Sequence, residues 1–415
     1  MFVNLRLFLH NIIMKKLSLL IPILLAPFIV SCDNVEKDNS LIFTEFYNGD
    51  NINDRAIELT NITDNAIDLS NYKLCNYRYN TGLDEPSEEI SLSGNLEPHH
   101  AYVICYDDAS NEIKALSNLI SEKLLNDGSF SISLKYKNKY IVDTIGFVGY
   151  EMNVARRCDL VRKQEHYFPR QNLYEEYDWI RYPFDDLSHL GNNECISETD
   201  LLKGPKLVQD NFNTPFCVDS TSGTGGTIKV SLNYCIDGDT TKFNFGYTYA
   251  AYGVSGSNSV RYFGINTPEI AHSYGETSDP YGDDAKEYTA SLINNGKAYI
   301  VQSVKNSSLF ERYGRVLGYV WVSNLVSPTN ESYSLLSFQI VKQGLARVSF
   351  VTRNEHKIDD LKYNGIFYEE YLYNAQNYFA TIIFSILYDL WLVVDEWINC
   401  IPKIGTNASA TKSLL

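Results

Sequence analysis

From residue 41 to residue 192, short runs of β-branched, aromatic and other apolar residues alternate with polar residues. Clusters of Asn, Asp, Gly and Ser separate these runs. A period of two is typical of β-strands, and it places one face of each strand in a core and the other in solvent. The segment is therefore predicted to be a β-sandwich, with strands near 41–46, 56–59, 66–69, 72–75, 102–106, 129–134 and 140–145.

A second set of strand patterns follows at 227–232, 241–249, 260–265, 299–304 and 315–322, and helical patterns occur at 280–293 and 335–343. Acidic residues at 283 and 284 suit the start of the first helix, and Gly344 suits the end of the second. The order of strands and helices predicts a small closed barrel of the OB type with helices added, so the chain as a whole is expected to be mainly β, with an α+β second domain.

The segment 193–226 is rich in Gly, Ser, Thr and Pro, and it is predicted to be a flexible linker between the two domains. Residues 361–397 have a helical pattern that includes a strongly apolar stretch at 379–394. This stretch is short for a membrane span and contains Asp389, so we expect a helix that packs on the barrel, with a membrane or partner contact as the alternative. The barrel domain is taken as 227–397, and 398–415 as a tail.

Residues 1–32 have the pattern of an export signal, with Lys15 and Lys16 before an apolar run that ends at Ser31-Cys32. The small residue before Cys32 resembles a bacterial lipobox, which implies lipidation at Cys32 and an extracytoplasmic lipoprotein on the cell membrane. A short transmembrane anchor is the alternative. Residues 33–40 are polar and are expected to form a tether.

The composition is compatible with globular domains, since 44% of the residues are hydrophobic and 13% aromatic. The net charge of −16 would disfavour a polyanionic ligand if it were spread evenly. However, residues 227–415 contain 15 Lys and Arg against 18 Asp and Glu, so the acidity lies mainly in the preceding domain. The eight cysteines show no C-x-x-C spacing, which gives a structural zinc site little support and leaves any disulfide pairing open.

Three short motifs in the second domain contain the candidate chemistry: 235–240 (CIDGDT), 261–269 (RYFGINTPE) and 311–315 (ERYGR). Asp239 on a tight turn suits a hard cation. Arg261 and Arg315 can form bidentate contacts to a phosphate. Glu269 follows a turn stiffened by proline, and it can take a proton from water. Each motif alone is common in turns and strand ends, so their order and spacing make the argument.

With these motifs, the second domain resembles the staphylococcal-nuclease (thermonuclease) family, which hydrolyses DNA and RNA with calcium and leaves 3′-phosphates. The resemblance implies that Asp239 and the Thr267 carbonyl bind Ca²⁺, that Arg261 and Arg315 hold the scissile phosphate, and that Glu269 is the general base. It further implies substrate contacts from three residues: Arg312, Tyr313 and Phe350.

The sequence departs from the family pattern at Asn266, where an Asp is usual. Asn266 still offers a carbonyl oxygen as a metal ligand but has no charge, so the calcium affinity is expected to fall. Phe350 and Thr352 stand where the family often has Tyr. Phe350 keeps an aromatic ring on which a base is expected to stack, whereas both positions lose the hydroxyl group of Tyr.

The first domain, 41–192, resembles the lamin-tail domain, an immunoglobulin-like sandwich, through motifs that include 43–46 (FTEF), 56–61 (AIELTN), 67–72 (IDLSNY) and 143–146 (DTIG). This resemblance implies a spacer or attachment module whose partner the sequence does not identify. Together, the two resemblances predict a monomeric, membrane-anchored, calcium-dependent nuclease that acts on external DNA and RNA. The alternative is a non-catalytic, adhesin-like surface lipoprotein that binds nucleic acid or protein.

Overall fold

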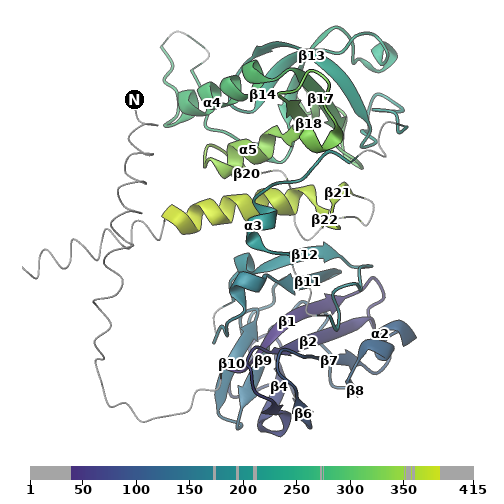
Figure 1. The fold of residues 1–415 in the computed structure, drawn as a ribbon, viewed down its shortest axis with the longest axis vertical. Helices are drawn as coiled ribbons and strands as arrows, with labels where there is room; N and C mark the ends of the chain where they lie inside the picture. Colours follow the sequence, from purple (N-terminus) through teal and green to yellow (C-terminus); the bar gives the residue numbers. More distant parts are fainter. Residues whose placement is uncertain are drawn as a thin grey trace, which may run out of the picture. The chain divides into compact units, whose positions relative to one another are not determined.

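The computed structural model describes residues 39–171, 174–192, 196–208, 213–271, 273, 275–349, 351, 357 and 360–383. The chain divides into two compact units, Met1–Asp38 and Asn39–Leu415, and every described residue belongs to the second. The described part is mainly β with few helices, as the sequence predicted (Figure 1). Cys32 and the export signal lie outside the described residues, as do Phe350 and residues 384–415.

The first domain consists of two β-sheets around one apolar core. The strands of the larger sheet run in the order β12 (Trp179–Pro183), β11 (Cys158–Arg162), β1 (Leu41–Asn48), β2 (Arg55–Asn61), β7 (Ala101–Tyr106) and β8 (Leu119–Ser121). The smaller sheet has the order β10 (Tyr140–Ile145), β9 (Ile132–Tyr136), β4 (Tyr72–Asn76) and β5 (Glu88–Ser91). A short ladder joins β3 (Ile67–Asp68) to β6 (Asn95–Leu96), and the helix α2 (Asn111–Leu116) precedes β8. Phe43, Leu74 and Leu134 belong to the shared core.

The expectation that one face of each strand meets solvent is wrong for β1 and β2, which are buried along their whole length. Polar side chains of this face form hydrogen bonds inside the protein: Thr44 Oγ1 donates to Glu58 Oε1 at 2.6 Å. The segment after β12 reaches the same face, where the backbone N–H of Gly191 donates to Glu58 Oε2 at 2.7 Å. Alternation identifies the two faces of a strand, but it does not show that a distant segment covers the polar one.

A buried ion pair joins the two sheets of the sandwich. Arg162 on β11 lies 2.7 Å from Asp143 on β10, measured from Nη1 to Oδ2, and both side chains are fully buried. Asp143 also accepts hydrogen bonds from the backbone N–H groups of Phe43 at 2.9 Å and Arg170 at 2.7 Å. The Arg162 guanidinium lies 4.7 Å from the centre of the Trp179 ring. The carboxylate therefore satisfies one buried charge and two buried backbone donors at once.

Asp143→Asn should destabilise the sandwich strongly, because Arg162 would keep its charge in a dry site without a counter-ion. Loss of one partner of a buried pair costs about 3–5 kcal/mol. The measurement is thermal unfolding of the full chain by calorimetry. Asp50→Asn is the matched control, since its pair with Arg157 is exposed, and a loss of at most about 1 kcal/mol is expected. Equal shifts in the two variants would contradict the argument.

The second domain is built on a closed five-stranded barrel, as the sequence predicted. The strand order is β15 (Ser257–Tyr262), β14 (Thr240–Asn244), β13 (Thr227–Cys235), β17 (Ala298–Ser303) and β18 (Val316–Ser323). A parallel pairing of β15 with β18, with Arg261 opposite Leu317, closes the barrel. This closure is consistent with an OB fold. Strand β19 (Ser334–Leu335) continues the sheet, and a short ladder pairs β16 (Ile265–Asn266) with β20 (Arg347–Val348).

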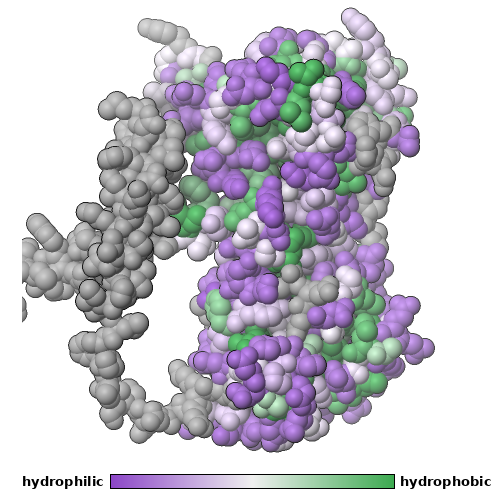
Figure 2. Space-filling view, in the orientation of Figure 1, coloured by the Kyte–Doolittle hydropathy of each residue, from purple (hydrophilic) through white to green (hydrophobic). Residues whose placement is uncertain are grey.

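Two helices of the barrel domain lie close to their predicted positions: α4 (Gly282–Asn295) and α5 (Leu336–Lys342). A further helix covers residues 368–383, after the hairpin of β21 (Lys362–Tyr363) and β22 (Ile366–Phe367). No described helix is long and apolar enough to cross a membrane, and most of the apolar stretch 379–394 lies beyond the described residues. The face of the molecule in Figure 2 is largely hydrophilic, with hydrophobic residues between the polar ones.

The Gly/Ser/Thr-rich end of the segment 193–226 packs against the barrel, although its composition predicted a flexible chain. Ser303 Oγ on β17 accepts hydrogen bonds from the backbone N–H groups of Thr224 and Gly225, both at 3.1 Å. Phe216 is fully buried, and its N–H donates to the hydroxyl of Tyr249 at 2.8 Å. Small residues are needed here because the backbone passes close to the barrel: a Cβ on Gly223 would lie 2.4 Å from the Val304 carbonyl oxygen.

Candidate active site

The turn between β13 and β14 places Asp239 almost out of contact with solvent, with 4% of its surface exposed. Its Oδ2 atom accepts a hydrogen bond from the backbone N–H of Thr267 at 2.9 Å, which brings the motifs 235–240 and 261–269 together. Gly238 makes this approach possible, because a Cβ there would lie 2.6 Å from Thr267 Oγ1. The turn is stabilised by Asp237, whose Oδ1 accepts from the N–H of Asp239 at 3.0 Å.

Arg261 links two of the predicted metal-binding residues. On β15 it lies opposite Thr240 of β14, and it is 7% exposed. Its Nη1 atom is 2.8 Å from Asp239 Oδ2, and its Nη2 atom donates to Asn266 Oδ1 at 2.8 Å. The guanidinium thus lies between Asp239 and Asn266, and it forms an ion pair with the first and a hydrogen bond to the neutral amide of the second.

Arg315, just before β18, approaches the same turn from the closing strand of the barrel. Its Nη1 atom donates to Thr240 Oγ1 at 3.2 Å, and its Nε atom donates to Glu311 Oε1 at 3.1 Å. Thr240 Oγ1 in turn donates to Asp239 Oδ1 at 3.1 Å. The barrel closure therefore brings Arg261 to the Asp239 carboxylate directly and connects Arg315 to it through the Thr240 hydroxyl.

The electrostatic environment differs between the two acidic groups beside these arginines. Burial raises the pKa of Asp239, and the nearby charge of Asp237 acts in the same direction, while Arg261 opposes both. At Glu311 burial also acts to raise the pKa, but hydrogen bonds from Arg315 outweigh it, and the pKa is lowered. Desolvation is the larger effect at Asp239 because its side chain is the more deeply buried of the two.

Glu269 lies in an exposed turn after Pro268, and its backbone is fixed by a residue that sequence reasoning did not select. The N–H of Glu269 donates to Asp279 Oδ2 at 3.1 Å, and the N–H of Asp279 donates to the Glu269 carbonyl at 2.8 Å. The only sequence signal for Asp279 is its place before Pro280 at the entrance of α4, where such pairs start turns. The carboxylate of Glu269 remains accessible to solvent.

The structure describes two of the three residues predicted to contact substrate, and all three roles stay predictions. Arg312 and Tyr313 are at the loop before Arg315, where Tyr313 is 68% exposed and its ring centre is 5.7 Å from the Arg315 guanidinium carbon. Gly314 has a φ of 79°, which lets this loop turn sharply back into β18. Phe350 lies outside the described residues, so its predicted stacking role stays a prediction.

The oxygens around Asp239 are chemically suited to a hard cation. Asp239 supplies a carboxylate, Asn266 a side-chain carbonyl and Thr267 a backbone carbonyl, and calcium accepts all three kinds of oxygen. The set has a single formal negative charge, and Arg261 already contacts both side chains. Within the described residues, no group of three or more His, Cys, Asp and Glu side chains could hold a metal. The donor types fit calcium, and the low charge predicts weak binding.

Comparisons with known proteins agree with the assignment of this region. Residues 259–365 match the family model described as "Staphylococcal nuclease homologue". The chain is 30% identical over 136 residues to the SPbeta prophage-derived endonuclease YokF of Bacillus subtilis (strain 168), covering 32% of this chain and 39% of the relative. It is 29% identical over 133 residues to Endonuclease YncB of the same organism, covering 32% and 54%. It is 28% identical over 96 residues to the Thermonuclease of Staphylococcus hyicus, covering 23% and 49%.

Residues 259–365 are thus similar to the staphylococcal-nuclease family, and this segment contributes strands to the closed barrel. The chain spans about half the length of the relatives that it matches, or less. The family match begins after the turn at Asp239. In the structure, this turn contacts the matched region through the Asp239–Thr267 and Asp239–Arg261 pairs.

Proposed function

We propose that the barrel domain, residues 227–397, is a nuclease that hydrolyses phosphodiester bonds of DNA and RNA and leaves 3′-phosphates. The strongest support is that Arg261 lies within hydrogen-bond distance of Asp239, and Arg315 within hydrogen-bond distance of Thr240, on one turn. The segment that contains Glu269 contacts the same turn through Thr267. Two guanidinium groups, a buried carboxylate and an accessible carboxylate are the parts that phosphoryl transfer to water needs.

In this mechanism Arg261 and Arg315 donate hydrogen bonds to the non-bridging oxygens of the scissile phosphate, where negative charge increases in the transition state. Arg261 must then exchange its contact with Asn266, a neutral amide, for the phosphate. Glu269 takes a proton from the attacking water, whose oxygen bonds to phosphorus as the bond from phosphorus to the 5′-oxygen breaks. The departing 5′-oxygen takes a proton from solvent and becomes a hydroxyl group. The Asp279 hydrogen bonds hold the Glu269 backbone in place for this step.

Calcium is the proposed cofactor, held by Asp239, Asn266 and the Thr267 carbonyl, and when bound it would neutralise charge on the phosphate. One specific observation favours the alternative of a non-catalytic surface protein that binds nucleic acid or protein: Arg261 already contacts the side-chain oxygens of both Asp239 and Asn266, so a cation would have to compete with this guanidinium for them. Cleavage assays with calcium and with a chelator separate the two functions.

Glu269→Gln and Arg315→Ala should each lower the rate of DNA cleavage by about 10²–10⁴-fold, because one removes the proton acceptor and the other a charge on the phosphate. The measurement is cleavage of single- and double-stranded DNA by the full chain in calcium. Glu287→Gln and Lys297→Ala are the matched controls, since both residues are exposed in the same domain and outside the site. Absence of calcium-dependent cleavage by the unaltered protein at every concentration tested would refute the enzyme proposal.

Asn266→Asp should shift the calcium dependence of cleavage to lower concentrations. A second carboxylate adds charge to the metal site, and calcium affinity rises with the number of charged ligands. The new carboxylate also gives Arg261 a second ionic partner, so a phosphate displaces that side chain less easily. The maximal rate should therefore increase less than the calcium affinity does. A calcium titration of activity measures both effects. An unchanged midpoint would show that Asn266 does not bind the cation.

The location at the cell membrane is also a proposal. It rests on the signal-like segment 1–32 with Cys32 at its end, on the polar tether 33–40, and on the first domain, for which we propose a lamin-tail type and a spacer or attachment role. The protein would then act as a monomer on external nucleic acid, from the extracytoplasmic side.

Cys32→Ala should release the protein from the membrane fraction, because the cysteine thiol is the proposed site of the lipid. The measurement is cell fractionation followed by detection of the protein in membrane and soluble pools. Cys235→Ala serves as the control, since Cys235 is a free cysteine in the barrel domain. Membrane association that persists in Cys32→Ala would exclude the lipid anchor and favour a hydrophobic one.

A further inference from the structure

A cleft with a volume of about 520 Å³ borders the turn that contains Glu269. One side is formed by the motif Asn266, Thr267, Pro268 and Glu269, and the rest by Asp279, Pro280 and the segment 344–347. The lining does not include Arg261, Arg312, Tyr313 or Arg315. The cleft therefore shares Asn266, Thr267 and Glu269 with the candidate active site, but the two arginines proposed to hold the scissile phosphate do not line it.

The walls of the cleft suit a nucleoside better than a phosphate. Pro268, Pro280 and Leu345 offer apolar surface, while the carboxylates of Glu269 and Asp279 can accept hydrogen bonds from sugar hydroxyls or base amino groups and would repel an anion. The volume is within the usual range of ligand pockets, ~300–1,000 Å³. An anionic group bound here must therefore lie at the one cationic side chain of the lining, Arg347.

Arg347 is fixed in position by the short ladder of β16 and β20. The register places Arg347 directly opposite Asn266, so the two side chains leave the ladder on the same face. Arg347 is exposed, and the structure records no ion pair for it among the described residues. Arg347 is thus a cation directly opposite a residue of the proposed metal site. It can bind a phosphate next to the one being cleaved.

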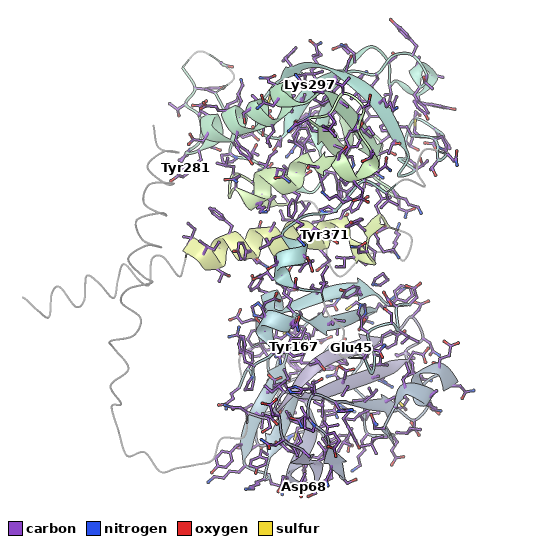
Figure 3. The ribbon with its side chains drawn as sticks, viewed as in Figure 1. Glu45, Asp68, Tyr167, Tyr281, Lys297 and Tyr371 are labelled. Atoms are coloured by element: carbon purple, nitrogen blue, oxygen red, sulfur yellow. The ribbon has the colours of Figure 1, made fainter. Side chains whose placement is uncertain are left out.

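Tyr281 stands at the edge of the cleft, directly after its lining residue Pro280, and it has two unusual properties. It is 71% exposed, and its φ is 68°, a left-handed conformation that is rare for a bulky residue. Figure 3 labels Tyr281 at the start of α4. The next residue, Gly282, packs so closely on the Glu269 turn that a Cβ there would lie 2.4 Å from the Glu269 carbonyl oxygen. Strained residues of this kind cluster at ligand sites.

We propose that this cleft binds a nucleotide next to the scissile phosphate, with its base stacked on Tyr281 and its phosphate paired with Arg347. Exposed aromatic rings combined with cationic side chains hold single-stranded nucleic acid with little sequence preference. The assignment of the nucleotide as the neighbour of a scissile bond rests on the proposed nuclease function, whereas the binding itself does not. Tyr281 and Arg347 are positioning residues, and they take no part in proton transfer.

The first test measures binding without catalysis. A fluorescein-labelled single-stranded oligodeoxynucleotide is titrated with the full chain in the presence of a chelator, and anisotropy is recorded. Tyr281→Ala should weaken binding about 10-fold and Tyr281→Phe should restore it, because stacking of one base on an aromatic ring is lost and regained. Lys297→Ala, an exposed residue away from the cleft, should bind as the unaltered protein does.

The second test separates recognition from folding. Tyr281→Gly removes the ring and suits a φ of 68°, so the variant should melt at the same or a higher temperature while binding as weakly as Tyr281→Ala. Arg347→Ala should reduce the slope of log affinity against log salt concentration by about 0.7, the value for one phosphate contact on a single strand, and Arg347→Lys should retain it. A purely structural role of Arg347 would leave this slope unchanged.

The outcomes distinguish this inference from the proposed function. If the unaltered protein binds the oligonucleotide but does not cleave it with calcium, the nuclease proposal fails and the binding variants still decide the role of the cleft. If it cleaves DNA while Tyr281→Ala, Tyr281→Gly and Arg347→Ala all bind normally, the cleft proposal is overturned and the nuclease proposal stands. If no binding is detected even at low salt, the cleft proposal is also overturned.

Discussion

The contact of Arg261 with Asp239 and Asn266 is the interaction on which the rest of the candidate site depends. It joins the turn after β13 to the strand β15 and to the short strand β16 that follows it. Both charged side chains are largely buried, so removal of either would leave the other desolvated. The same contact has two consequences: it organises the site, and it occupies the atoms that calcium and a phosphate would use. Ligand binding must therefore rearrange an existing ion pair.

Two close backbone approaches determine where Glu269 lies. Gly238 allows Thr267 to reach the Asp239 turn, and Gly282 allows the start of α4 to reach the Glu269 carbonyl. Asp279 completes this arrangement with a reciprocal pair of hydrogen bonds to the Glu269 backbone. The carboxylate of Glu269 is thus attached to a rigid turn while its side chain remains free to move. This combination suits a group that must receive a proton from water, because position and access are both preserved.

The two domains differ in charge as well as in fold. Residues 33–226, which include the sandwich, contain 17 Lys and Arg against 33 Asp and Glu, so this part repels a polyanion, whereas the barrel region is close to neutral. Within the sandwich, the Arg162–Asp143 pair stabilises the packing of the two sheets and has no accessible surface for a ligand. This division of charge agrees with a spacer or attachment role for the first domain and with nucleic-acid contact confined to the second.

The sequence determined the strand periodicity, the mainly β architecture and the three motifs of the site, because local alternation and turn chemistry are properties of short segments. It placed α4 and α5 within a few residues, since acidic residues at one helix start and Gly344 at one helix end are local signals. It could not show that a distant segment buries the polar face of β1 and β2, or that the segment 214–226 packs on β17. Asp279 and Arg347 line one cleft because the start of α4 approaches the Glu269 turn and β16 pairs with β20. These contacts link residues far apart in the chain, and backbone packing in three dimensions decides them.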